Sequence, residues 1–195
     1  IPAVGIAMWD GNTWSALPQP IEFATSRGAL RPWLQALTTW DPDGPGPLPP
    51  RLVIGGSFTA IGGVPIRGIA MWDGATWLPF GSGVQGGVLA LLPHPSGDLY
   101  VGGQFVTAGG QPANYIARWD GTTWSPLGSG ATVGFFMGSP ISAIVRALTA
   151  LPNGDVVAGG DLRNVVFGAF QFIEHLPGRM QQAFAGLCQD HSFVD

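Results

Sequence analysis

Short apolar runs, closed by glycine, proline or an Asp-Gly pair, follow one another along most of the chain. In the middle of the sequence these runs cover 88–92, 98–101, 115–119 and 123–127. The turn between the last two is Asp120-Gly121, and both residue types tolerate the positive φ that a tight hairpin turn needs. Runs of this length between turn residues are typical of β-strands. The pattern therefore predicts four strands in this part of the chain.

The same order of runs recurs. A box of the form Ile-Ala-x-Trp-Asp-Gly-x-x-Trp stands at 6–14, 69–77 and 116–124. A glycine pair followed by an aromatic residue, Gly55-Gly56, returns as Gly102-Gly103 after 47 positions, and a third pair, Gly159-Gly160, follows 57 positions later. A period of 20 to 50 residues indicates a solenoid, propeller or array, and a unit of four strands is typical of a propeller blade.

We therefore expect an all-β fold made of β-propeller blades of four antiparallel strands, about three to three and a half blades in this chain. The expected units are an outer half-blade at 1–17, a blade at 34–80, a blade at 88–127 and the inner half of a further blade at 143–161. Residues 162–195 lack the box, and both degenerate strands and an irregular tail stay open for them. Because propellers usually have about 4 to 8 blades, the chain is expected to be a fragment of a longer propeller or to form a homo-oligomer.

On these motifs the chain resembles kelch-like propeller repeats, in which an apolar strand ends in Gly-Gly and an aromatic pair follows. It is most similar to the Gly-Gly-x-Phe and Trp-Asp-Gly-x-x-Trp repeats of extracellular propellers of the fungal cortical-marker and secreted bacterial types. The resemblance covers about residues 1–161. It implies an extracellular or cell-surface protein, and it implies that the loops after the second and fourth strands lie on one face. Those loops are 57–67, 104–114, 18–33 and 131–142.

The composition of the chain argues against several classes of function and structure. Only 10% of the residues are charged, the eight cations are all arginine, and the net charge is −4, so the basic surface that nucleic-acid binding requires is missing. No apolar run approaches the length of about 20 residues that spans a membrane. Cys188 is the single cysteine, which excludes an internal disulfide.

Most of the repeated polar and aromatic residues are expected to be structural. Asp10, Asp73 and Asp120 each precede a glycine and are interpreted as turn residues rather than a ring of carboxylates. The six tryptophans of the boxes occupy equivalent positions, where packing between adjacent sheets is the expected role. No catalytic constellation is found, and the sequence predicts no metal site and no cofactor.

Candidate contacts for a ligand or partner lie in the expected loops, because loops on a rigid scaffold commonly carry binding. They are Arg27, Arg31, Trp33, Gln104, Asn114, Phe135, Phe136 and Met137. The apolar group Phe135-Phe136-Met137 is expected either to be tucked over the channel or to be exposed for a partner.

The sequence thus predicts a non-enzymatic binding module for a protein or a glycan on an extracellular surface. The alternative is a structural, self-assembling repeat protein whose open blades pair between chains into a ring or filament.

Overall fold

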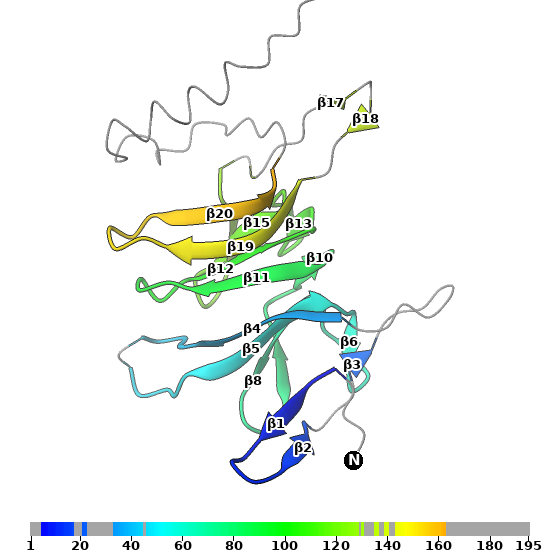
Figure 1. Ribbon diagram of the computed structural model, residues 1–195, viewed down its shortest axis with the longest axis vertical. Helices are drawn as coiled ribbons and strands as arrows, with labels where there is room; N and C mark the ends of the chain where they lie inside the picture. Colours follow the sequence, from blue (N-terminus) through cyan, green and yellow to red (C-terminus); the bar gives the residue numbers. More distant parts are fainter. Residues whose placement is uncertain are drawn as a thin grey trace, which may run out of the picture.

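The computed structural model describes residues 5–17, 21–22, 33–44, 46–128, 130, 135–136, 139–140 and 143–162. Within these ranges every regular element is a β-strand, and the strands form antiparallel sheets stacked one above another (Figure 1). The prediction of an all-β fold is confirmed.

Two of the sheets have four strands each. The first has the order β4 (Trp33–Trp40), β5 (Arg51–Ser57), β8 (Ile69–Trp72) and β9 (Trp77–Pro79). The second has the order β11 (Val88–Pro93), β12 (Leu99–Gly103), β15 (Ile116–Trp119) and β16 (Trp124–Pro126). The four strands predicted within 88–127 are confirmed, each bound lying within two residues of the prediction.

Two further hairpins lie at opposite ends of the stack (Figure 1). At one end β1 (Ala7–Trp9) pairs with β2 (Trp14–Ala16), which corresponds in sequence to β8 and β9. At the other end β19 (Ile144–Ala150) pairs with β20 (Val156–Asp161), which corresponds to β11 and β12.

The matching segments pair in matching register. Gly55 lies opposite Ile69 in the first sheet, and Gly102 lies opposite Ile116 in the second. The first strand of each pair carries a bulge at the same place, between Leu34 and Ala36, between Val88 and Ala90, and between Val145 and Ala147. The second glycine of each pair faces this bulge. A Cβ at Gly103 would overlap the carbonyl oxygen of Gly87, so only glycine fits.

The first glycine of each pair sets the contact between sheets. A Cβ at Gly55 would overlap Cγ1 of Val88 in the next sheet, and a Cβ at Gly102 would lie 2.5 Å from Cγ1 of Val145. Both valines are fully buried. The absence of a side chain on one sheet therefore makes room for a branched side chain on the next, as close packing of a protein interior requires.

Aromatic residues continue this packing between the outer strands. Phe80 follows β9, and its ring contacts Trp119 of the next sheet at a centroid distance of 5.5 Å. Trp124 Nε1 donates a hydrogen bond of 2.8 Å to the Phe80 carbonyl. Leu17 occupies the position of Phe80 one unit earlier and packs against the buried cluster that contains Trp77.

The expectation that the box tryptophans are packed between sheets holds for Trp77 and Trp119 but is wrong for the first box. Trp77 is 5% exposed, whereas Trp14, its equivalent, is 70% exposed. Trp9 is also exposed. Among the residues that the structure describes, no sheet lies beyond β1 and β2 to cover these two rings.

Two small three-stranded sheets lie at one end of the four-stranded sheets (Figure 1). One contains β3 (Ile21–Glu22), β6 (Ala60–Ile61) and β7 (Val64–Pro65), and another contains β10 (Val84–Gln85), β13 (Thr107–Ala108) and β14 (Gln111–Pro112). A hairpin of β17 (Phe135–Phe136) and β18 (Ser139–Pro140) is separate from them. The segments 57–67 and 104–114, expected as loops, therefore contain hairpins. Strands of two residues are too short to leave a periodic signal.

We expect Gly102→Ala to destabilise the fold by about 1–3 kcal/mol, because the added methyl group overpacks the contact with Val145. Urea unfolding of the single variants Gly102→Ala and Val145→Ala and of the double variant measures this effect. The double variant should be more stable than the sum of the two single changes predicts, since the smaller side chain leaves room for the new methyl group. Strict additivity would show that this contact does not set the sheet spacing.

Candidate functional site

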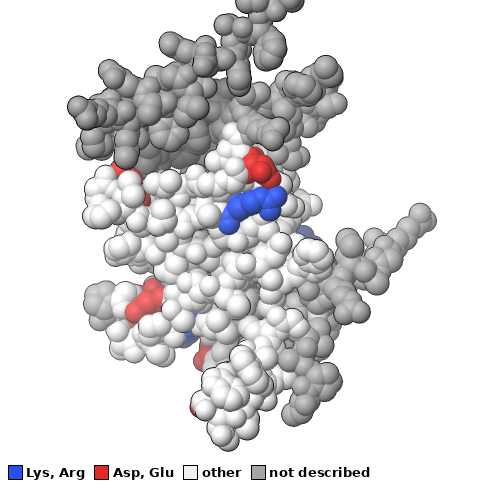
Figure 2. All heavy atoms as spheres, in the orientation of Figure 1, with Lys and Arg blue, Asp and Glu red and all other residues white. Residues whose placement is uncertain are grey.

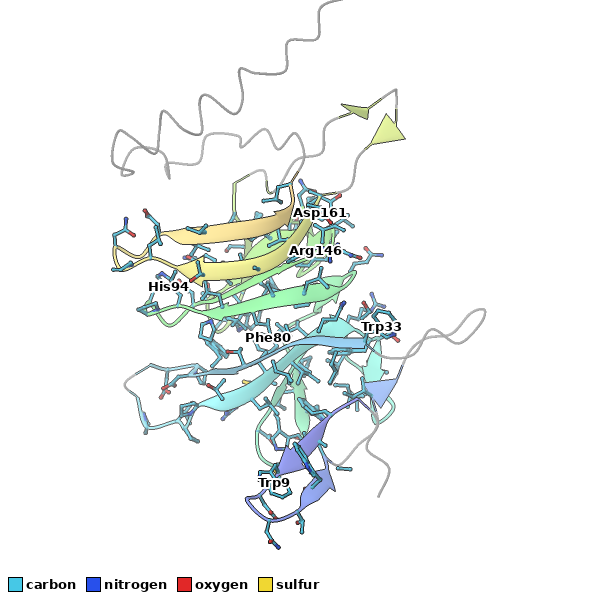
Figure 3. All side chains as sticks on the ribbon, viewed as in Figure 1. Trp9, Trp33, Phe80, His94, Arg146 and Asp161 are labelled. Carbon is cyan, nitrogen blue, oxygen red and sulfur yellow. The ribbon has the colours of Figure 1, made fainter. Side chains whose placement is uncertain are left out.

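The two ends of the stacked strands differ in chemistry. At one end, called here the small-sheet end, the first strand of each sheet begins, the second strand ends, and the small sheets follow (Figure 1). At the other end, called the turn end, lie the Asp-Gly turns and the hairpin turns that join β4 to β5, β11 to β12 and β19 to β20. Trp33, Arg146 and Asp161 lie at the small-sheet end, and His94 lies at the turn end (Figure 3).

Trp33 was expected in an inserted loop, and this expectation is wrong. It is the first residue of β4 and lies opposite Ser57, so the sheet holds its backbone in place. Its side chain is 62% exposed. The strand therefore holds the backbone of Trp33 in place, while most of its surface is exposed.

Gln104 and Asn114 also lie at the small-sheet end. Gln104 is exposed directly after β12, and its backbone N–H donates a 2.8 Å hydrogen bond to the carbonyl of Gly87. Asn114 is half-buried in the turn before β15, with a φ of 34°. Gly87 lies next to Ser57, since a Cβ there would be 2.8 Å from Ser57 Oγ. The structure thus places Trp33 and Gln104 at corresponding ends of two neighbouring sheets.

The other predicted contacts are not described in side-chain detail. Arg27, Arg31 and Met137 lie outside the described residues. Phe135 and Phe136 form β17, with Phe135 opposite Pro140, and only their backbone is described. The choice between a tucked and an exposed apolar group therefore also lies outside the described part of the chain.

Sequence reasoning missed an ion pair at this end. Arg146 lies at the bulge of β19, and its Nη2 is 2.8 Å from Oδ2 of Asp161 at the end of β20 (Figure 3). Both side chains are more than half exposed. Asp161 follows its glycine pair directly, as Ser57 and Gln104 follow theirs. These three residues form a row along the small-sheet end, and their position after Gly-Gly is the sequence signal that could have located it.

Apart from the Arg146–Asp161 pair and the exposed Arg67 between β7 and β8, most described side chains around this row are neutral. Figure 2 shows few blue or red atoms among the described residues on the face in view. Exposed neutral polar side chains at this end include Gln35, Ser57, Gln85, Gln104 and Gln111. Such a surface offers hydrogen bonds from amides and hydroxyls.

At the turn end the repeated aspartates are turn residues, as expected. The carboxylate of Asp120 accepts hydrogen bonds from the backbone N–H groups of Thr122 and Thr123 at 2.9 and 2.8 Å. Asp10 and Asp73 make the same pair of bonds in their own turns. These bonds, with those from the threonine hydroxyls, lower the pKa of all three carboxyls.

The geometry of these turns differs from the expected two-residue form. Trp119 pairs with Trp124, so four residues form the loop, and within it only Gly121 has a positive φ, of 99°. Asp120 contributes its side chain rather than an unusual backbone conformation. This is the Asx-turn use of aspartate.

A cluster around His94 also has a structural explanation. His94 Nε2 donates to the carbonyl of Gly154 in the next sheet at 2.9 Å, because a carbonyl oxygen can only accept. Its Nδ1 then accepts the N–H of Ser96 at 3.1 Å. Trp40, at the same position one sheet earlier, donates from Nε1 to the carbonyl of Gly97 at 2.9 Å. Both side chains tie the turn of one sheet to the turn of the next.

Tyr100 lies against this cluster, with its ring 5.4 Å from that of His94. Burial, and then the negative charge of Asp98, raise the pKa of its hydroxyl. Asp98 itself accepts a hydrogen bond from Ser96 and is 3.5 Å from Arg118. At the turn end these groups therefore provide one another with hydrogen-bond partners and a counter-charge.

Within the described ranges no three His, Cys, Asp or Glu side chains gather closely enough to hold a metal ion. The same part of the chain contains no helix that is long and apolar enough to cross a membrane. Comparison of the chain with protein-family models, with curated proteins and with solved structures gives no match.

The Asp turns should make stability depend on pH. The pKa of Asp10, Asp73 and Asp120 lies below the ordinary value of 3.8 in the folded protein, so the unfolded state binds more protons in acid. Their contribution is present above an ordinary carboxyl pKa and is lost as the pH falls through the lower folded values. We expect the urea midpoint to fall between about pH 5 and pH 2, and to fall less in the triple variant Asp10→Asn, Asp73→Asn, Asp120→Asn.

Asn12→Ala is the matched control, because it changes the same loop and leaves every carboxylate in place. It should keep the wild-type slope of stability against pH. An unchanged slope in the triple variant would contradict this role of the aspartates.

Proposed function

We propose that this chain is part of a β-propeller of the kelch-like type, with blades at the positions expected from the sequence. The support is the shared strand order, register and bulge of the matching segments, together with the stacking of one sheet on the next. Sheets related in this way form a rigid scaffold, on which one end can vary without altering the core.

The function that the geometry supports best is non-enzymatic binding of a neutral glycan at the small-sheet end, on an extracellular surface. The observation that carries this proposal is Trp33, whose ring is 62% exposed on a strand. An exposed aromatic face suits the apolar face of a sugar ring, and the neighbouring amides and hydroxyls suit its hydroxyl groups.

The aspartates of the Asp-Gly turns and His94 have structural roles at the turn end. The three Asp carboxylates are held by their own turns, and His94 links two turns. A general base or nucleophile needs a free partner at hydrogen-bond distance from a substrate. Binding without chemistry is therefore the proposal, and a protein ligand at the same end is the competing possibility.

Trp33→Ala tests the glycan assignment. We expect wild-type protein to bind at least one member of a panel of neutral β-1,4-linked glucose and N-acetylglucosamine hexamers, measured by calorimetry. The variant should bind about tenfold more weakly, because one aromatic contact contributes about 0.5–1.5 kcal/mol. Unfolding curves should stay close to wild type, since the removed ring is exposed.

Trp14→Ala is the matched control, since Trp14 is also an exposed indole but lies in the β1–β2 hairpin. It should leave sugar binding unchanged. Absence of binding to the whole panel, or equal affinity in Trp33→Ala, would remove the glycan assignment and favour a protein ligand.

A further inference from the structure

The hairpin β19–β20 has the shape of half a sheet. In the four-stranded sheets the second strand pairs on both sides, β5 with β4 and β8, and β12 with β11 and β15. Its counterpart β20 pairs with β19 alone within the described part of the chain. A strand edge of this kind exposes unpaired backbone N–H and C=O groups, which favour pairing with a further strand.

The hairpin β1–β2 has the shape of the other half. Its residues Ile6-Ala7-Met8-Trp9 have the same sequence as Ile69-Ala70-Met71-Trp72, the strand that pairs with β5. Yet β1 pairs with β2 alone among the described strands, and Met8 and Trp9 are exposed. A strand sequence that pairs with Leu-Val-Ile-Gly at one place is thus present at a second place without such a partner.

The faces of the two half-sheets are also complementary. On β20, Val157 is 45% exposed, and no atom of the described residues lies within 4 Å of a Cβ at Gly159. Their counterparts on β5 are covered, since Val53 is fully buried and Gly55 touches Val88. The β19–β20 face therefore has the glycine that accepts a branched side chain, and no such side chain from the described residues reaches it.

A branched side chain that could pack on Gly159 is present on β4, at the opposite end of the stack. Leu34 holds the bulge position of Val88 and Val145 on β4. Leu37, three residues on, is 59% exposed, whereas its counterpart Leu148 packs within 3.4 Å of a Cβ at Gly102. The two faces lie at opposite ends of one molecule in Figure 1, so they cannot meet within a single copy in this arrangement.

We propose that a second copy of this chain completes the half-sheet. In this interface β1 of the second copy pairs with β20 in the register Gly159 opposite Ile6, Ala158 opposite Ala7, Val157 opposite Met8 and Val156 opposite Trp9. This is the register of Gly55 opposite Ile69 and Leu52 opposite Trp72. Leu34 of the second copy then packs on Gly159, as Val88 packs on Gly55.

The interface is head to tail, so it closes a ring or continues as a filament. In its described residues each copy has two complete four-stranded sheets and two half-sheets, so a closed dimer contains six four-stranded sheets. That number lies within the range of about 4 to 8 found in propellers. The inference rests on the propeller architecture of the proposed function, but it does not require a glycan ligand.

Disulfide trapping tests the register. Ala7→Cys and Ala158→Cys are combined in the full 195-residue chain with Cys188→Ser, and the protein is oxidised. Directly opposite positions of antiparallel strands suit a disulfide, so we expect a covalent dimer, with the 7–158 link identified by peptide mass. The matched control combines Ala7→Cys with Val157→Cys. Residue 157 points to the other face of the strand, so this pair should remain unlinked.

The mass of the unmodified chain in solution provides the second measurement. We expect wild-type protein to sediment as a dimer or larger assembly at micromolar concentration. Gly159→Leu should shift it to a monomer with an unchanged far-UV spectrum, because a Cβ there has no described atom of its own copy within 4 Å, whereas the longer side chain occupies the place of Leu34.

A wild-type monomer, a 7–158 link within one chain, or equal linking of the control pair would overturn the proposal. Association only after removal of residues 163–195 would also overturn it, since that segment would then occupy the edge itself. Glycan binding by a wild-type monomer would leave the proposed function standing, whereas a trapped dimer without sugar binding would leave only this inference.

Discussion

The close approach of a glycine in one sheet to a branched side chain in the next is the contact on which the stack depends. Gly55 meets Val88 and Gly102 meets Val145 at distances that leave no room for a Cβ. Around this contact the apolar faces of β5 and β12 are covered by β11 and β19, and Val53, Val88 and Val101 are fully buried in one cluster there. The hydrophobic effect favours the stacking, while the glycine makes the spacing small enough for dense packing.

Each sheet therefore obtains part of its core from its neighbour. Trp77 and Trp14 stand at the same position of the same sequence box, yet one is buried and the other is exposed. Trp77 belongs to a buried cluster against which Leu17 packs, whereas Trp14 has its partner Trp9 alone as a ring contact among the described residues. The burial of a residue in such an array depends on the sheet beside it more than on its own sequence.

This dependence explains what the sequence predicts well. The strands of the four-stranded sheets are visible because each has several apolar residues between turn residues, and the role of Asp120 follows from the residue types beside it. The exposure of Trp9 and Trp14 was not predictable from the box, because identical residues receive different neighbours.

Other features leave too little signal in the sequence. The strands β6 and β13 have two residues each, and their pairing with β3 and β10 joins segments that are distant in sequence. The sequence predicts Trp33 as part of a loop because the bulge at Leu34 interrupts the alternation of inward and outward side chains along its strand. The ion pair between Arg146 and Asp161 depends on strand register, which spacing alone does not determine.

The two ends of the strands are under different structural constraints. At the turn end, hydrogen bonds from Trp40 and His94 fix each turn to the next, so a change of residue there disturbs the stack. At the small-sheet end, the position after Gly-Gly holds Ser57, Gln104 or Asp161, and the backbone pairing stays the same. Side chains can therefore vary at this end without loss of the fold, which is the freedom that a binding surface requires.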